Sequence, residues 1–243
     1  MLREDECIDD LQLDKLVIIQ KTNGFKFGID AVLLSDFAKD TVSRRTLDLC
    51  TGTGIIPLLL SAKTNTTDIC GLEIQHDICD MAKRSVCLNS LSERVHITEG
   101  DLKNACDIYG KAVFDKITCN PPYMECGKGL TNAADTLSVS RHEIKCTLDD
   151  VVRMSSQLLK NKGHFFMVHR PSRLADIICT MRAYNLEPKK LRFVHPSPYR
   201  AANLILIDGV KHGGKELKML PPLYVYNQNG EFSEEIDNIY GRI

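Results

Sequence analysis

Residues 47–54 read Leu-Asp-Leu-Cys-Thr-Gly-Thr-Gly, and they link a short apolar run at 46–50 to a helical pattern at 55–63. Glycines between a strand and a helix permit a tight turn and let a ligand approach the free N–H groups of the helix N-terminus. A dinucleotide-binding fingerprint would place a third glycine at position 57, where this chain has Pro57. The stretch therefore predicts a ligand-binding turn of an α/β sheet, and a ligand with a carboxylate fits it as well as one with a pyrophosphate.

On both sides of this turn, short apolar runs alternate with helical patterns. We predict strands at 46–50, 68–73, 95–98, 114–119, 164–169, 190–194 and 203–208, and helices at 31–38, 55–63, 76–91, 148–160 and 173–184. Repeated strand–helix–strand units predict a parallel sheet covered on both faces. The fold class is therefore α/β, a Rossmann-like seven-stranded, mostly parallel sheet with helices on both faces and an antiparallel edge strand formed by the last two runs.

The two ends of the chain read differently from this core. We expect an extended segment at 11–20, a turn, and Asp30 as the N-cap of the first helix. Residues 223–231 predict a short hairpin, and the acidic tail after it predicts a terminal helical turn. The expected organisation is one domain over 1–243, with an N-terminal extension and closing segment (1–40), a core (41–210) and a C-terminal hairpin and tail (211–243).

The composition is that of a globular protein: 43% of the residues are hydrophobic and 26% are charged. No apolar run reaches the length of a membrane span, and the acidic start is unlike a signal peptide. The ten cysteines are scattered and include no C-x-x-C pair. We therefore expect a cytoplasmic protein without a metal site, and a monomer is favoured.

The net charge of −1 hides an asymmetry. Residues 1–150 carry 17 lysines and arginines against 24 acidic residues, whereas residues 151–219 carry 13 against 4. A basic segment beside an acidic half is what a polyanion-binding enzyme would show. Solvated helix faces are the alternative for any single basic residue.

Polar side chains close four consecutive predicted strands. Asp48 lies at the end of the first, Glu73 ends the second, Asp101 follows the third and Asn120 follows the fourth. The carboxyl ends of parallel strands meet at one edge, where open α/β sheets bind ligands. An acidic residue after the second strand is suited to ribose hydroxyls. A carboxylate after the third can accept a hydrogen bond from an exocyclic amine.

The fourth strand continues into Asn-Pro-Pro-Tyr at 120–123. Two prolines fix φ and remove two N–H donors, so the turn is rigid and its carbonyl groups are free to accept hydrogen bonds. An amide precedes the prolines and an aromatic ring follows them. These groups suit the capture of a planar group that bears an NH2, although a loop opener would have the same sequence.

Together these motifs resemble the S-adenosylmethionine-dependent methyltransferases, and Asn-Pro-Pro-Tyr resembles the subset that methylates an amino or amide nitrogen. The chain is most similar to the bacterial valine-tRNA (adenine-37, N6) methyltransferases. The similarity also includes residues 24–34, Arg-His-Glu at 141–143 and Arg-Pro-Ser-Arg-Leu at 170–174.

The resemblance implies a role for each motif. The catalytic residues would be Asn120 and Pro121, which accept the two amine hydrogens, and Tyr123, which stacks on the base. The methionine end of the cofactor would lie against the glycine turn, its ribose against Glu73 and its adenine against Asp101. The full cofactor-binding set would be Phe27, Gly28, Asp30, Ala31, Asp48, Cys50, Thr51, Gly52, Gly54, Glu73, Ile74, Asp101, Leu102 and Asn120.

The substrate would be held by other parts of the chain. Residues 124–140 form a long loop that we expect to be a substrate lid. The basic candidates for RNA contact are Lys189, Lys190, Arg192, Arg200 and Arg141, with Lys160, Lys162, Arg170 and Arg173 beside them. His195 and Tyr199 are candidates to stack on RNA.

The expected activity is therefore methylation of an adenine N6 in tRNA. The alternatives are methylation of a glutamine amide on a release factor, methylation of guanine N2 in ribosomal RNA, and a catalytically silent RNA-binding protein. Only some 25 residues precede Phe25, which leaves no room for a helical substrate domain like that of the glutamine methyltransferases.

Overall fold

The computed structural model describes residues 2–23, 27–122 and 146–242. The strands are β1 (Glu6–Asp10), β2 (Val17–Lys21), β3 (Arg45–Leu49), β4 (Asp68–Glu73), β5 (Val95–Glu99), β6 (Phe114–Cys119), β7 (Leu159–His169), β8 (Leu186–His195), β9 (Leu204–Lys211), β10 (Lys218–Met219) and β11 (Leu223–Tyr224). The helices are α1 (Ile29–Ala38), α2 (Ile55–Lys63), α3 (His76–Leu88), η1 (Leu102–Asn104), α4 (Ala105–Tyr109), α6 (Leu148–Leu158), η2 (Pro171–Arg173), α7 (Leu174–Ala183) and α8 (Glu234–Ile239).

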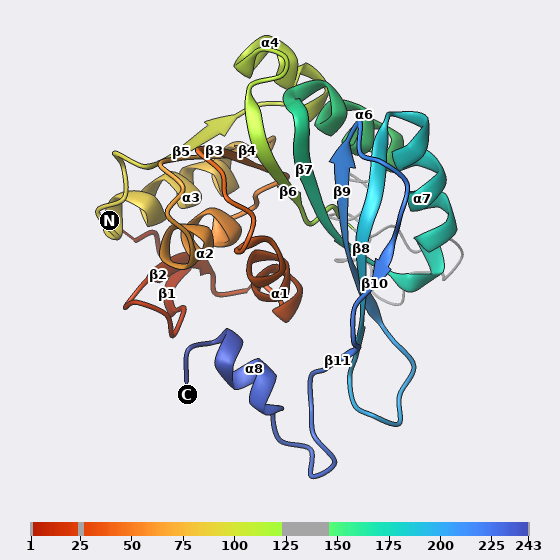
Figure 1. Cartoon of the computed structure of the whole chain (residues 1–243). Coiled ribbons are helices and arrows are strands. Elements are labelled where there is room, and N and C mark those ends of the chain that lie inside the picture. Colours follow the sequence, from red (N-terminus) through yellow and green to blue (C-terminus); the bar gives the residue numbers. More distant parts are fainter. Residues whose placement is uncertain (1, 24–26, 123–145, 243) are drawn as a thin grey trace, which may run out of the picture.

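The large sheet has the order β10-β8-β9-β7-β6-β3-β4-β5, with β11 also beside β8 (Figure 1). All of its pairs are parallel except those of β9, which runs antiparallel to both β7 and β8. The predicted α/β class and the seven long strands are confirmed, and the short strands β10 and β11 add to them. We predicted that the antiparallel strand would lie at the edge of the sheet. In the structure this strand is β9, and it lies between β7 and β8.

The hydrophobic core has two layers, one on each face of the sheet. Along β7, Phe166 and Val168 pack with α1 and α2, while Phe165 and Met167 pack with α6 and α7. This alternation follows from the two-residue period of a strand. Figure 1 shows α1, α2 and α3 on one side of the sheet and α6 and α7 on the other.

The N-terminal segment is a hairpin of its own. β1 pairs with β2 in a separate two-stranded sheet, where we predicted one extended segment at 11–20. The outer edge of β2 is hydrogen-bonded to α3: Ile19 N donates to Ser85 Oγ and Val17 N to Asn89 Oδ1, each at 2.9 Å. Ser85 and Asn89 are one helical turn apart and Val17 and Ile19 are two residues apart, so the helix satisfies the exposed edge of the strand.

Several element boundaries differ from those predicted, including those near the two ends of the chain. Helix α1 begins two residues earlier, with Gly28 as its N-cap, so Asp30 lies inside the first turn rather than at the cap. At the C-terminus, β11 joins β8, a single bridge pairs Tyr226 with Phe232, and α8 has six residues where only a helical turn was predicted. Among the helices of the described residues, none is long and apolar enough to span a membrane.

Candidate active site

The carboxyl ends of neighbouring parallel strands meet at one edge of the sheet. The chain runs outward from β3 through β4 to β5 and then returns to β6 on the other side of β3. Such a reversal is a topological switch point, where open α/β sheets bind ligands. Because Leu49 of β3 pairs with Cys119 of β6, the glycine turn and Asn120 emerge side by side at this point.

The glycine turn has three residues in the left-handed region. Cys50, Gly52 and Gly54 have φ of 57°, 57° and 85°. A non-glycine residue there is strained, and such strain clusters at ligand sites. Apart from Gly52 and its two chain neighbours, no atom of the described residues lies within 4 Å of the position that a Cβ would take on Gly52. The turn therefore presents bare backbone to open space, while Gly54 begins helix α2 as its N-cap.

Asp48 lies behind this turn and is fully buried. Its Oδ1 accepts a hydrogen bond of 2.7 Å from Thr118 Oγ1 on the neighbouring strand β6. Its Oδ2 is buried without a hydrogen-bond partner within the described ranges, and the buried Thr51 hydroxyl is nearby. Burial raises the pKa of Asp48 to about 7, although the two hydroxyls oppose this shift. An orphaned carboxylate oxygen of this kind is costly unless a ligand supplies a donor.

Glu73 joins the end of β4 to the glycine turn. Its Oε2 accepts a hydrogen bond of 2.9 Å from Gly52 N, and its Oε1 accepts one of the same length from Gln75 N. A carboxylate has about four acceptor positions, so these two bonds leave room for the hydroxyls of a ribose. Glu73 therefore shapes the turn and remains suited to the predicted contact. Ile74, which follows it, is half-buried.

Asp101 and Leu102 follow β5. Asp101 is the N-cap of η1, and its Oδ1 accepts a hydrogen bond of 2.9 Å from Lys103 N. Leu102 is buried. Gly100 N donates to Glu73 O at 2.9 Å, which draws the ends of β4 and β5 together. Asp101 thus has a capping role whether or not it also contacts an adenine.

Asn120 follows β6 and contacts helix α1. Its Nδ2 donates to Asp30 Oδ2 at a distance of 3.0 Å. Pro121 is buried and Pro122 is exposed. Two of the predicted residues, Tyr123 and Arg141, and the predicted lid at 124–140 lie outside the described residues.

The segment before α1 approaches the same edge. Phe27 N donates to Gln20 Oε1 on β2 at 2.9 Å, and Gln20 Nε2 in turn donates to Asp9 Oδ2 at 2.6 Å. Ala31 is buried in the first turn of α1. Because Asp30 is hydrogen-bonded to Asn120, the first turn of α1 lies beside the end of β6.

Three thiols cluster beside the turn. Cys50, Cys119 and Cys146 interact with one another, and Cys146 precedes helix α6. The Cys119 thiol, more than burial, raises the pKa of Cys50 well above its usual value, and burial raises that of Cys119. These cysteines are therefore thiols and not thiolates. Within the described residues, no three His, Cys, Asp or Glu side chains are arranged for a metal ion.

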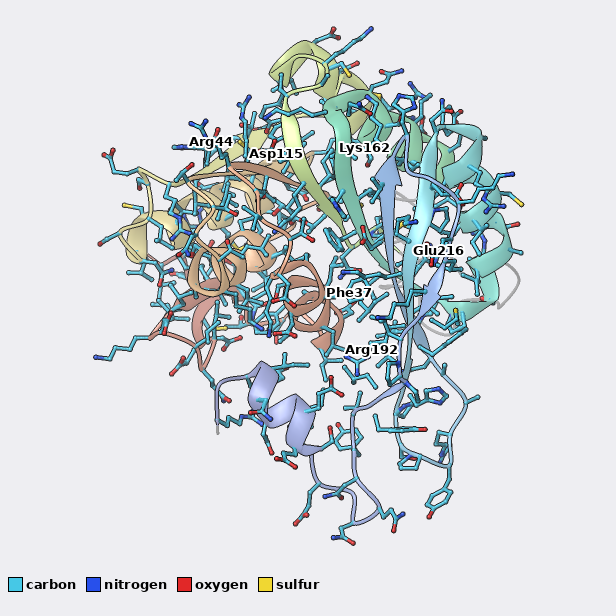
Figure 2. All side chains as sticks on the ribbon, viewed as in Figure 1. Phe37, Arg44, Asp115, Lys162, Arg192 and Glu216 are labelled. Carbon is cyan, nitrogen blue, oxygen red and sulfur yellow. The ribbon has the colours of Figure 1, made fainter. Side chains whose placement is uncertain are left out.

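The predicted RNA-binding residues do not all lie near Asn120. Lys190 is in the middle of β8, beside Lys218 of β10, and Lys189 Nζ donates to Gly214 O at 3.0 Å. Arg192 points toward α8, where it forms an ion pair of 2.7 Å with Glu235 (Figure 2).

A second group of basic residues lies at the edge that carries Asn120. Arg170 follows β7, Arg173 precedes α7, and Arg200 lies in the connection from β8 to β9 with the strongly exposed Tyr199. Arg170 Nη1 reaches Asn203 O at 3.4 Å, so the two connections lie against each other. By contrast, Lys162 lies with Arg44 and Asp115 at the opposite edge, where Lys160 pairs with Asp115 (Figure 2).

The sequence alone did not indicate three residues of the site: Thr118, Gln20 and His169. His169 ends β7, so the pattern of polar residues at strand ends could have identified it as a fifth candidate. It is almost fully buried, and burial lowers its pKa to about 4. Its neutral Nδ1 accepts a hydrogen bond of 2.8 Å from Arg170 N, which orients the segment that carries Arg170.

Solved structures with the same fold include two methyltransferases. A predicted O-methyltransferase from Agrobacterium tumefaciens superposes with a TM-score of 0.71 and 22% identity, over 87% of this chain and 95% of that one. A 16S rRNA N2 methyltransferase from T. thermophilus superposes with a TM-score of 0.60 and 16% identity, over 87% of this chain and 52% of that one.

Curated relatives cover most of the chain. Proteins from Porphyromonas gingivalis, Parabacteroides distasonis and Aeromonas salmonicida are 26%, 27% and 28% identical to it, over 75%, 81% and 75% of this chain and 73%, 81% and 75% of their own. Each is named tRNA1(Val) (adenine(37)-N6)-methyltransferase. The model of the methyltransferase small domain matches residues 28–178, more than half of the chain. The chain therefore belongs to the methyltransferase small domain family.

Proposed function

We propose that this protein transfers a methyl group from S-adenosylmethionine to the N6 amine of an adenine in tRNA, and that the target is adenine 37 of a valine tRNA. The observation that carries the proposal is the position of Asn120. It stands at the switch point, beside the glycine turn, and opens a rigid Pro-Pro turn. The names of the relatives support the choice of nucleic acid.

The described residues fit the proposed methyl donor. The orphaned Oδ2 of Asp48 calls for a cation or an N–H donor, which the methionine end of the donor carries. Gly52 leaves the adjoining space open, and Glu73 retains acceptor positions for the ribose. Asp101 and Leu102 would hold the adenine. When bound, the donor supplies a methyl group made electrophilic by its sulfonium.

The protein's own groups would prepare the amine. The lone pair of an aromatic amine is delocalised into its ring, so the amine is a poor nucleophile. The side-chain oxygen of Asn120 and the carbonyl of Pro121 can each accept one hydrogen of the amine. Two such bonds favour tetrahedral nitrogen and aim its lone pair at the methyl group. Positioning of this kind supplies most of what an in-line displacement needs, and Tyr123 would stack on the base.

An adenine within a folded tRNA loop must swing out to reach Asn120. The tRNA backbone would then lie along the edge that carries Arg170, Arg173 and Arg200, because lysine and arginine neutralise phosphates and fix the register of a nucleic acid. Tyr199 projects from the same edge and is 81% exposed. We place the first RNA contact on these four residues rather than on Lys189 and Lys190.

The test distinguishes the proposed function from the alternatives by identifying which molecule becomes methylated. Labelled S-adenosylmethionine is incubated with the protein and total tRNA, total rRNA or release factor in separate reactions. Label in tRNA that digests to N6-methyladenosine supports the proposal. Label in release factor, label as N2-methylguanosine in rRNA, or no label in any pool would each replace it with one of the three alternatives.

A further inference from the structure

Strand β6 holds helix α1 at both ends. At the C-terminal end of the helix, Lys116 Nζ donates to Ala38 O at 2.7 Å, and at the N-terminal end Asn120 donates to Asp30. Lys116 and Asn120 are four residues apart, which is about 13 Å along a strand, and a ten-residue helix is about 15 Å long. The separation of Asp30 from Asn120 is therefore set by two regular elements that are anchored to each other.

The bond between Asp30 and Asn120 decides which way the amide faces. An ionised carboxylate has no hydrogen to donate, so only the NH2 end of the amide can bond to it. The carbonyl oxygen of Asn120 must then lie on the other side, away from Asp30 Oδ2. This is the orientation that an acceptor for an incoming amine requires, since a flipped amide would present its own NH2 to the NH2 of the target.

Asp30 is itself held in place. Its Oδ1 accepts a hydrogen bond of 3.0 Å from Ala31 N in the first turn of α1, where the helix dipole favours a negative charge. A Cβ on Gly28 would lie only 2.7 Å from this oxygen. Gly28 has φ of −96°, which any residue can adopt. The absence of a side chain at position 28 therefore serves the placement of the Asp30 carboxylate.

We infer that Asp30 is a positioning residue for methyl transfer, acting through Asn120. It keeps the carbonyl oxygen of Asn120 toward the target amine, and its charge polarises the amide so that this oxygen accepts more strongly. The inference rests on the proposed function, because it assigns a role in the transfer step.

The test compares Asp30→Asn with wild type in steady-state transfer to tRNA, with separate measurement of cofactor and tRNA affinity. An amide at position 30 can accept or donate, so it no longer enforces one orientation of Asn120. We expect kcat to fall ~10–100-fold, which is less than for loss of a polar group at the reacting centre itself, with both affinities changed less than about threefold. Asp36→Asn removes another carboxylate of α1, one paired with Lys39 and Lys63, and should leave kcat unchanged.

Two further variants separate positioning from folding. Gly28→Ala keeps the charge but displaces the carboxylate, so it should lower kcat in the same direction. In an Asn120→Ala background, Asp30→Asn should reduce the residual rate less than about twofold, because both changes act on one group.

Several results would overturn the inference. One is a loss of cofactor affinity by Asp30→Asn that matches its loss of kcat/KM, and another is a wild-type kcat in both Asp30→Asn and Gly28→Ala. Wild-type protein that labels no tRNA would instead refute the proposed function.

Discussion

At the scale of single residues, the burial of Asp48 gives the proposed cofactor site a dependence on pH. Its pKa of about 7 means that the carboxyl group is about half protonated near neutral pH in the ligand-free protein. Below pH 7 the neutral form prevails and its attraction for an ammonium group is lost. The effect of pH on folding is opposite to its effect on binding. The native pKa of Asp48 lies above the usual 3.8, so protonation of this group favours the folded state at low pH. This contribution to stability is lost as pH rises from 3.8 toward 7.

The first prediction is that cofactor binding strengthens as pH rises. If only ionised Asp48 binds, the dissociation constant of S-adenosylmethionine should fall roughly tenfold between pH 6 and pH 8. Isothermal titration calorimetry across this range measures it. Asp48→Asn should bind more weakly and with a flatter pH profile. A slope that persists in Asp48→Asn would assign the titration to another group, such as the amino group of the ligand.

The second prediction concerns Asn120. Asn120→Ala removes an acceptor for the target amine, so kcat should fall at least ~100-fold, the scale seen for loss of one polar group at a reacting centre. The affinity for S-adenosylmethionine should stay nearly constant in Asn120→Ala. Calorimetry measures this affinity, and Asp48→Asn serves as the control variant in which it is expected to fall. An equal loss of cofactor affinity in Asn120→Ala would show that the residue mainly holds the donor.

The sequence predicted the strand-end residues but not their partners. Asp48, Glu73 and Asn120 were detectable because polar residues at strand ends share an edge in any parallel sheet. Thr118 was not, because its contact with Asp48 depends on β3 pairing with β6, and local patterns do not show which strands are neighbours. Gln20 lies in an apolar strand, and its role depends on a turn that brings Phe27 back to it.

At the scale of elements, the N-terminal hairpin is attached to α3 by a buried ion pair. Arg84 donates to Glu6 through both terminal nitrogens, at 2.7 and 2.6 Å, and Arg3 N adds a third bond to Glu6. These bonds, with Arg84 the largest cause, lower the pKa of Glu6 to about 2. Since the native pKa lies below the usual 4.5, the pair stabilises the fold above pH 4.5 and loses this contribution as pH falls toward 2.

The third prediction is that Glu6→Ala destabilises the protein by about 3 kcal/mol, because it leaves Arg84 partly buried without its main partner. For a chain of this size the melting temperature should fall by roughly 6–12 °C, as measured by differential scanning calorimetry. Asp5→Asn, which breaks the exposed pair with Lys21 on the same hairpin, should change it little. Equal effects of the two variants would contradict the assignment.

The misplaced antiparallel strand has a cause that the sequence contains. β9 begins Leu-Ile-Leu-Ile and its first six residues are buried, which is typical of a strand with neighbours on both sides. β8 mixes Lys189, Lys190 and Arg192 with apolar residues, as an outer strand does. The short connection predicted that β8 and β9 pair with each other, but only this difference in composition indicates which of them lies next to β7.

At the scale of the whole molecule, the charge asymmetry is distributed over several regions. Among the basic residues of the segment 151–219, Arg170 and Arg200 lie at the carboxyl edge, Lys189 and Lys190 lie on β8, and Lys160 lies at the opposite edge. Only the first region adjoins Asn120. The net charge of residues 151–219 indicated a polyanion partner, but a sum over a stretch of sequence does not show on which surface each basic residue lies.

The fourth prediction follows from that division. Arg170→Glu combined with Arg200→Glu should weaken tRNA binding and reduce the slope of log Kd against log salt by about 1.4–1.8, since each lost phosphate contact removes roughly 0.7–0.9. Fluorescence anisotropy with labelled tRNA from 50 to 200 mM salt measures the slope. Lys189→Glu combined with Lys190→Glu is the matched control with the same change in charge. A larger slope change in the control would move the RNA to the outer part of β8.

The insertion of β9 between β7 and β8 bears on how the chain is assembled as it leaves the ribosome. Strands β3 to β6, with the glycine turn and Asn120, are complete once residue 120 has emerged, and each of them finds its neighbour among residues already made. β7 and β8 cannot be joined until residues 204–211 are synthesised, because β9 is the strand that pairs with both. A nascent chain thus forms the half with the glycine turn and Asn120 first, and the edge that carries Arg170 and Arg200 is completed last.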